Sequence, residues 1–273
     1  MQQVRNVTGT AFVVAEFRAE ENDAADPLYR DLVVNLFLNE ATRAAAERIA
    51  SAFPLMKEMV KIRTKYFDEM LEKQILAGCR QVVVLGAGLD TRAVRKAAPD
   101  LKYFEVDDGE TLAMKQARMK GHGIEANVTF IAGNYVTDGL MPLLMQNGLD
   151  PMMATYIIWE GNTMYLPGKD GMAVMGHLKD SLRTFCLSFD YFARSIITHT
   201  TGELGLTRMS ENFSSMGAPW VTGFDDIYQL ARDAKLRVVE GFTTGELYRL
   251  YRPATPTQPA FGPYYSVCTL ASL

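Results

Sequence analysis

The stretch "VVVLGAGLDTR", residues 82–92, constrains the fold more than any other part of the sequence. Four apolar residues of high β-propensity lead into Gly86 and Gly88, and the start of a helix follows. This order brings a glycine-rich backbone to the carboxyl end of a parallel strand, where doubly wound α/β folds bind nucleotides. The stretch therefore predicts a turn that a ligand can approach closely.

The rest of the chain repeats the alternation of strand and helix. Two amphipathic helices are expected over 41–77, interrupted at Pro54, and the strand-like runs "LKYFEVD", "VTFIAG", "ATYIIWEG" and "RTFCLSFDYF" come after the glycine turn with helical patterns between most of them. Such an order is typical of right-handed βαβ units and a parallel sheet with helices on both faces. The predicted fold class is α/β and doubly wound.

We expect one domain in four parts: an N-terminal helical cap (1–78), a cofactor-binding core (79–192), a lid or substrate insertion (193–223) and a final helix with two strands (224–273). The insertion is rich in Thr, Ser, Gly and Met and is expected to be irregular. The last two strands, "RVVEGF" and "YYSVCTLAS", are separated by a Pro-rich stretch without a recognised helical pattern. They suggest an antiparallel hairpin at the edge of the sheet.

Composition excludes several classes of protein. The 273 residues carry a net charge of -4 with mixed signs and no basic run, so nucleic acid is not an expected partner. Cys79, Cys186 and Cys268 lack the paired spacing of zinc or redox sites and are expected to be reduced, with no metal. No stretch has the roughly 18 apolar residues of a membrane span, and the N-terminal apolar run is too short for a signal sequence. We expect a cytoplasmic protein without a membrane partner.

A carboxylate follows the glycine turn at the distance expected of a ribose ligand. Asp107 ends the strand "YFEVD" about twenty residues further on, as both NAD and adenosyl cofactors require. The third glycine of the dinucleotide pattern is replaced by Thr91, which weakens the NAD interpretation. Alternatively, Asp107 only caps the next helix and the glycines only form a tight turn.

Together with "YFEVD", "GNY" and "EGNTMYLP", the glycine stretch resembles the leucine carboxyl methyltransferase family, which includes phosphatase-methylating enzymes and bacterial enzymes that act on polyketides and other small molecules. The resemblance extends to "FRAEENDAADPLYRD", "IRTKYFD" and "GAPWVTGFD", in the family's order, and so covers most of the chain. It implies S-adenosylmethionine as cofactor and a class I methyltransferase (Rossmann-like) sheet of seven strands with the last strand reversed.

The resemblance also implies a task for each cofactor residue. Arg63 would pair with the methionine carboxylate, although a lone arginine on an amphipathic helix is more often solvated. Gly86 and Gly88 would let the backbone pass beneath the same moiety, and Asp107 would accept hydrogen bonds from the ribose hydroxyls.

Three further positions complete the implied cofactor site. Asn134 and Tyr135 would frame the adenine, with Asn134 standing where the family usually has an aspartate. Glu160 would lie beside the methionyl amine or the sulfonium. A carboxylate in its place, directly after the strand "YIIW", would be costly to bury without a partner, which favours a ligand role.

The substrate side of the site is less well defined. Tyr165 could direct its hydroxyl at a substrate carboxylate or be an ordinary buried tyrosine, and His199 in the insertion is a candidate base. Val136 stands where the phosphatase-methylating members carry an arginine, which argues against a phosphatase substrate. Four apolar residues favour a pocket for an apolar small molecule instead: Phe213, Met216, Trp220 and Phe224.

These patterns predict an S-adenosylmethionine-dependent O-methyltransferase that converts a carboxylate of a small-molecule or polyketide-type metabolite into a methyl ester. Methylation of a hydroxyl, enol or phenol is the alternative. Two other classes stay open: an NAD-dependent oxidoreductase, supported by the glycine turn and Asp107, and a non-catalytic adenosyl-binding scaffold, suggested by Asn134. The sequence does not indicate an oligomeric state.

Overall fold

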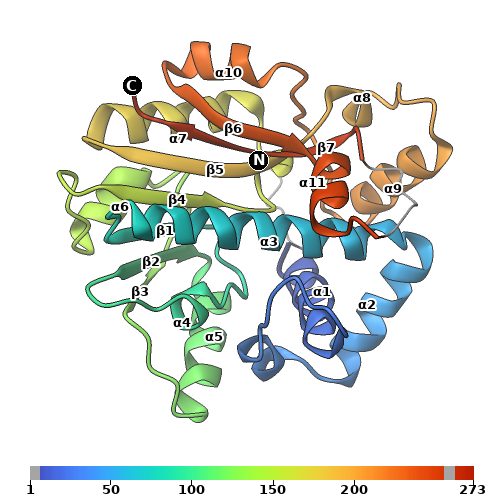
Figure 1. Cartoon of the computed structure of the whole chain (residues 1–273), viewed down its shortest axis with the longest axis horizontal. Coiled ribbons are helices and arrows are strands. Elements are labelled where there is room, and N and C mark those ends of the chain that lie inside the picture. The colour runs from blue at the N-terminus through green and yellow to red at the C-terminus, as the bar shows by residue number, and fades with distance from the viewer. Residues whose placement is uncertain (1–6, 255–261) are drawn as a thin grey trace.

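One seven-stranded sheet forms the centre of the protein (Figure 1). The computed structural model describes residues 7–254 and 262–273. The strand order is β3-β2-β1-β4-β5-β7-β6. The strands are β1 Gln81–Leu85, β2 Lys102–Asp107, β3 Val128–Ala132, β4 Thr155–Trp159, β5 Phe185–Phe192, β6 Arg237–Thr243 and β7 Tyr265–Ala271. Strands β1 to β5 are parallel, and β7 is antiparallel to both of its neighbours. The predicted doubly wound sheet with a reversed last strand is confirmed.

Helices cover both faces of this sheet. The α-helices are α1 Val7–Ala19, α2 Glu40–Ala52, α3 Leu55–Leu76, α4 Arg92–Arg95, α5 Gly109–Gly121, α6 Leu140–Gln146, α7 Gly168–Ser181, α8 Arg194–Ile197, α9 Leu204–Ser215, α10 Ile227–Ala234 and α11 Thr244–Tyr251. Short 3₁₀ helices span Glu20–Asp23 (η1), Val33–Phe37 (η2) and Thr163–Tyr165 (η3). The expected pair of helices on either side of Pro54 is confirmed as α2 and α3.

The central strand β1 is buried along its whole length because both of its faces are covered. Val82 and Val84 belong to a buried cluster that also contains residues of α3 and α11, whereas Val83 and Leu85 belong to a second cluster with residues of α6, α7 and α10. Alternate residues of a strand point to opposite faces, so an uninterrupted apolar run is what a doubly covered strand requires. The long helix α3 runs across one face of the sheet (Figure 1).

The segment 193–223 is more regular than the sequence suggested. It contains α8 and the twelve-residue helix α9, whose Leu206, Met209 and Phe213 are buried against residues of α1, α2 and α3. The expectation of an irregular segment was wrong because its frequent Ser, Thr and Gly obscure one apolar stripe at helical spacing. A role for this segment as a lid stays a prediction.

The C-terminal prediction was partly wrong. Strands β6 and β7 do pair antiparallel at one edge of the sheet, with β6 outermost, but helix α11 lies between them in the chain where a loop alone was expected. Thr243 and Glu246 form a capping box that starts α11. Part of the Pro-rich stretch, 255–261, lies outside the described residues.

Across the described part of the chain, no helix combines the length and the hydropathy that a membrane crossing requires.

A buried ion pair connects β2 to α5. Nζ of Lys115 donates to a carboxylate oxygen of Glu105, and the two side chains are 2% and 1% exposed. The other Glu105 oxygen, Oε1, has no hydrogen-bond partner among the described residues. Burial raises the pKa of Glu105 to about 7, although the charge of Lys115 opposes this. The ionised carboxylate therefore depends on Lys115.

We expect Lys115→Met to lower the free energy of unfolding by about 3 to 5 kcal/mol at pH 8, because it leaves a buried carboxylate without its cation. The loss should be smaller at pH 5: a raised pKa means that the folded state holds the proton more tightly, and a neutral carboxyl costs less to bury. Urea unfolding at both pH values measures this. The exposed pair of Lys73 and Glu240 supplies the control, since Lys73→Met should change stability by less than about 1 kcal/mol. Equal losses for the two variants would contradict the assignment.

Candidate functional site

The glycine turn lies at the carboxyl edge of the sheet, between β1 and β2. Gly86 and Gly88 have φ angles of +62° and +48°, in the left-handed region that favours glycine. The backbone N–H groups of Gly86 and Ala87 donate to the carbonyl oxygen of Val106, at 2.9 and 3.2 Å. The turn is therefore attached to the end of the neighbouring strand.

Asp107, the last residue of β2, holds this turn in place. Its Oδ2 accepts a hydrogen bond from the backbone N–H of Gly88 at 2.6 Å, and its Oδ1 accepts one from the N–H of Asp108 at 2.7 Å. The residue that caps α5 is Asp108, whose Oδ1 accepts from the N–H of Thr111 at 2.9 Å. The alternative in which Asp107 caps the helix is thus wrong. Burial raises the pKa of Asp107, and each of its oxygens keeps a second lone pair.

Arg63 approaches the same edge from α3 and is 6% exposed. Its Nε donates to Oε1 of Glu160 at 3.0 Å, and its Nη1 donates to Oδ2 of Asp190 at 3.1 Å and to the hydroxyl of Tyr265 at 2.8 Å. Burial disfavours the charge, but Tyr265, Asp190 and Glu160 outweigh it and raise the pKa of Arg63. The sequence indicated Arg63 and Glu160 but neither Asp190 nor Tyr265.

Arg92 extends this network to the residues after the glycine turn. Its Nη1 lies 2.8 Å from Oε2 of Glu160 and also pairs with Asp90, while its Nε donates to Oδ1 of Asp68 at 2.7 Å. Arg92 is 2% exposed. Glu160 therefore bridges two buried guanidinium groups, one from α3 and one from α4. Arg92 ends the "LDTR" stretch, and its position directly after the glycine turn is the sequence signal for its place in this network.

Asn162 crosses over the glycine turn. Its amide nitrogen donates to the carbonyl oxygen of Glu160 at 2.7 Å and to that of Leu85 at 3.3 Å. A Cβ atom built on Gly86 would lie 2.6 Å from Cγ of Asn162, a distance that real Cβ contacts do not reach. A glycine is therefore favoured at position 86 for two reasons: its φ angle is positive, and Asn162 occupies the space that a Cβ atom would need.

Asn134 and Tyr135 follow β3 at the same edge but differ in exposure. Asn134 is exposed, and its Oδ1 accepts from the N–H of Val136 at 2.9 Å in a local turn. Tyr135 is 8% exposed, and its hydroxyl accepts a hydrogen bond from Nε1 of Trp159 at 3.0 Å. Their proposed places beside an adenine stay predictions.

Tyr165 and His199 lie in different surroundings. Tyr165, in η3, is half-buried, and burial raises the pKa of its hydroxyl while Trp220 and Arg63 oppose this shift. His199 is exposed in the connection between α8 and α9, and its Nε2 lies 3.1 Å from Oγ of Ser210. The hydroxyl of Tyr165 therefore lies close enough to Arg63 to be influenced by its charge.

The four residues predicted to form an apolar substrate pocket are divided between two places. Phe213 and Trp220 stack with ring centroids 4.8 Å apart and belong to the cluster between α9 and the N-terminal helices. Phe224 instead packs against Tyr191, at 5.8 Å, on the cluster under α7 and α10. Met216, at the end of α9, is 36% exposed. The structure does not bring all four together.

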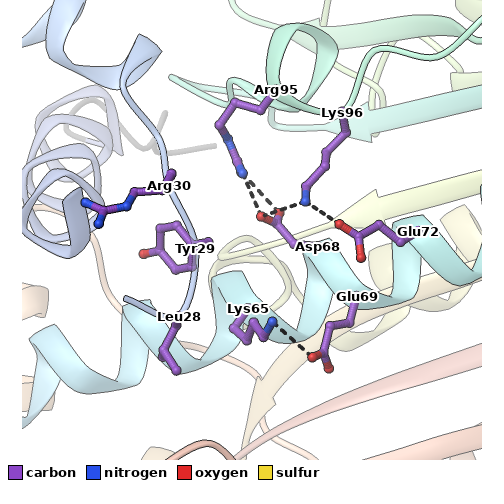
Figure 2. A pocket seen from close by; sticks show the side chains of 9 residues that line it. All are labelled: Leu28, Tyr29, Arg30, Lys65, Asp68, Glu69, Glu72, Arg95 and Lys96. Carbon is purple, nitrogen blue, oxygen red and sulfur yellow. Dashed lines mark hydrogen bonds and ion pairs between the residues drawn. The ribbon is translucent and has the colours of Figure 1, made fainter. Parts of the chain in front are cut away.

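A cavity of about 120 Å³ lies away from the glycine turn, beside α3 (Figure 2). Its charged walls are already paired: Arg95 and Lys96 contact Asp68, and Lys65 contacts Glu69. None of the predicted site residues lines it; its walls are Leu28, Tyr29, Arg30, Lys65, Asp68, Glu69, Glu72, Arg95 and Lys96. We therefore place the candidate site at the glycine turn and not in this cavity.

Comparison with known proteins identifies the family. The leucine carboxyl methyltransferase family model matches residues 11–179, which include the glycine turn, Arg63 and Glu160. The chain belongs to this family. A relative from Mycolicibacterium smegmatis, named "Putative S-adenosyl-L-methionine-dependent methyltransferase", is 33% identical over 177 residues, which cover 59% of this chain and 56% of the relative. A second relative, from Streptomyces coelicolor, carries the same description. It is 33% identical over 179 residues, which cover 60% of this chain and 62% of that protein. The match thus spans less than two thirds of either relative.

Solved structures of low sequence identity share the fold of this leucine carboxyl methyltransferase family member. A DUF574 family protein from Streptomyces avermitilis has a TM-score of 0.66 at 11% identity, with 97% of both chains covered. Magnesium protoporphyrin IX methyltransferase from Synechocystis, solved with bound SAH, has a TM-score of 0.52 at 12% identity and covers 97% of this chain and 100% of its own. At these identities the likeness shows a shared fold and nothing further.

Gly86→Ala should lower the free energy of unfolding by about 2 to 4 kcal/mol, because it adds both left-handed strain and a clash with Asn162. Gly88→Ala is the matched control: it has the strain, but its Cβ would meet only Cβ of Ala11 at an ordinary 3.4 Å, so we expect a loss of about 1 to 2 kcal/mol. Thermal and urea unfolding measure both.

The clash itself is tested by combining the change with Asn162→Ala. In the Gly86→Ala background this second change removes the obstruction, so it should cost less stability than it does alone. Strictly additive effects would show that Asn162 does not restrict Gly86.

Proposed function

We propose that this protein binds S-adenosylmethionine at the glycine turn and transfers its methyl group to an oxygen atom of a small molecule. The observation that carries the proposal is the contact of Asp107 with the Gly88 amide, which brings a carboxylate and a partly exposed stretch of glycine backbone to one edge of the sheet. Membership of the leucine carboxyl methyltransferase family and the names of the relatives support the cofactor.

The residues at this edge fit such a cofactor. Nη2 of Arg63 donates to none of the residues that the structure describes, whereas Nε and Nη1 are already paired, so the two N–H groups of this one nitrogen are available for the methionine carboxylate. Asp107 has lone pairs left for the ribose hydroxyls, and Glu160 offers negative charge to the methionyl amine. Asn134 and Tyr135 are the candidates to frame the adenine.

Bound S-adenosylmethionine would supply an electrophilic methyl group, whose bond to sulfur breaks as a bond to the substrate oxygen forms, with the electron pair passing to sulfur. The protein's part is to orient the two reactants and to exclude water, which can contribute several kcal/mol. A carboxylate nucleophile is already ionised at neutral pH and needs no base. We therefore propose a carboxylate as acceptor and a methyl ester as product, with Tyr165 positioned to orient it.

We propose that the carboxylate that accepts the methyl group belongs to a small apolar metabolite of polyketide type. Val136 provides no cation for a peptide carboxylate, and Phe213 and Trp220 offer an aromatic wall next to Tyr165. Methylation of an acidic hydroxyl is the second candidate, and His199, although exposed and hydrogen-bonded to Ser210, is the base that it would use.

Asp107→Ala should weaken S-adenosylmethionine binding by about 2 to 4 kcal/mol, because two hydrogen bonds to a charged acceptor are lost and the turn loses its anchor. Isothermal titration calorimetry measures this, with NAD as a second ligand that should not bind. Asp108→Ala is the control, since it removes the cap of α5 but leaves the cofactor affinity within about twofold. Binding of NAD in place of S-adenosylmethionine would replace the proposal with the oxidoreductase alternative.

A carboxylate acceptor predicts that kcat/KM is nearly flat from about pH 6 to pH 8 and that His199→Ala has a mild effect. Base-assisted transfer to a hydroxyl should instead rise through a pKa in that range and fall roughly 10²-fold or more when its base is removed. Initial rates on a panel of acids and phenols distinguish the two. A product that survives mild alkaline hydrolysis is an ether and would exclude the ester.

A further inference from the structure

Asp190 and Tyr265 form a buried pair behind Arg63, and the assignment of cofactor residues gives neither of them a task. Both are 0% exposed. Tyr265, at the start of β7, accepts a hydrogen bond from Nη1 of Arg63 and donates one to Oδ2 of Asp190. Asp190, on β5, accepts from Arg63 with Oδ2 and from the backbone N–H of Gly161 with Oδ1, at 3.1 and 2.6 Å.

This arrangement fixes the plane of the guanidinium. Glu160 binds Nε, and the Asp190–Tyr265 pair binds Nη1, so two of the three nitrogens are held from different strands. Because a guanidinium is planar, two fixed nitrogens determine where the third one points. Nη2 is then aimed without any contribution from a ligand.

Gly161 keeps the space beside this third nitrogen open. Its φ angle is +72°, and a Cβ built on it would lie 3.1 Å from Nη2 of Arg63. The same residue donates its N–H to Asp190, so the loop after β4 is held by the group that also holds Arg63. The loop position and the guanidinium orientation are therefore coupled through one carboxylate.

We infer that Asp190 and Tyr265 are positioning residues, which hold Arg63 so that its Nη2 meets the carboxylate of the bound cofactor. The inference rests on the proposed binding of S-adenosylmethionine. A buried aspartate without such a task would be an unfavourable residue in a strand, because its desolvation is not repaid by ion pairing alone. The pair reduces the loss of side-chain freedom that Arg63 would otherwise suffer when a ligand binds.

The test compares two ligands that differ in the moiety that Arg63 would hold. S-adenosylhomocysteine carries the amino acid carboxylate, whereas 5′-methylthioadenosine has the same nucleoside and lacks it. Tyr265→Phe should weaken S-adenosylhomocysteine binding roughly tenfold, equivalent to one hydrogen bond to a charged group, and change methylthioadenosine binding by less than about twofold. Calorimetric titration of the full chain measures both dissociation constants.

Two further variants complete the experiment. Asp190→Asn should show the same selectivity with a larger loss; if it does not fold, Tyr265→Phe decides the question alone. In an Arg63→Lys background, Tyr265→Phe should have almost no additional effect on S-adenosylhomocysteine, because the planar group that it orients is gone. Tyr156→Phe is the matched control: this buried β4 tyrosine donates to Oγ of Ser188 on β5 at 2.8 Å, and its loss should leave both affinities unchanged.

The possible results separate the inference from the function on which it rests. If the unchanged protein binds S-adenosylhomocysteine but Tyr265→Phe weakens both ligands equally or neither, the positioning role is overturned and the proposed function stands. If the unchanged protein binds neither ligand, the proposed function is refuted and the inference with it. A loss confined to S-adenosylhomocysteine, absent from Tyr156→Phe, supports both.

Discussion

The double ion pair of Glu160 with Arg63 and Arg92 joins three parts of the fold that are far apart in the sequence. Arg63 comes from the long helix α3, Arg92 from the short helix after the glycine turn, and Glu160 from the end of β4. An unpaired charge in such a buried place would cost several kcal/mol, so the three elements can pack only where their charges meet. The relative position of α3 and the sheet edge is thereby restricted.

The network does not by itself explain why these residues are charged. Apolar side chains of similar volume would often fill such a space with equal or greater stability, because ion pairs repay their desolvation poorly. In the proposed function, the charges at this edge serve a ligand that carries charges of its own. The zwitterionic amino acid moiety of the proposed cofactor needs a cation and an anion beside it, and Arg63 and Glu160, joined by a hydrogen bond of 3.0 Å, are the groups proposed to supply them.

The sequence predicted the sheet well because its signals are local. Uninterrupted apolar runs mark β1 and β4, and the glycines at 86 and 88 mark the turn, whatever the rest of the chain does. Helix α9 was missed because its stripe of Leu206, Met209 and Phe213 is buried in a cluster whose other members come from distant parts of the chain, among them the N-terminal helices and Trp220. Helix α11 was missed because it has only 8 residues and a Pro-rich stretch follows it.

The site was predicted less completely because its contacts span long separations. Arg63 meets Asp190 across 127 residues and Tyr265 across 202, and no periodicity or spacing connects such positions. One signal was available in the sequence. Asp190 interrupts the otherwise mainly apolar run "FCLSFDYF" of a strand expected to be buried, and a buried acid requires a partner. A buried aspartate therefore predicts a cationic partner, but the sequence alone does not identify which of the 28 lysines and arginines it is.

Tyr265 shows how the two halves of the candidate site are connected. Its hydroxyl belongs to the Arg63 network, whereas its ring packs against Phe192 with centroids 4.9 Å apart, and Phe192 in turn lies 4.3 Å from the ring of Trp220. A tyrosine can do this because it has an apolar body and a polar tip. A change in the aromatic cluster that shifts the ring of Tyr265 must also move its hydroxyl, and with it the orientation of Arg63. Packing on the proposed substrate side is therefore physically coupled to the guanidinium on the proposed cofactor side.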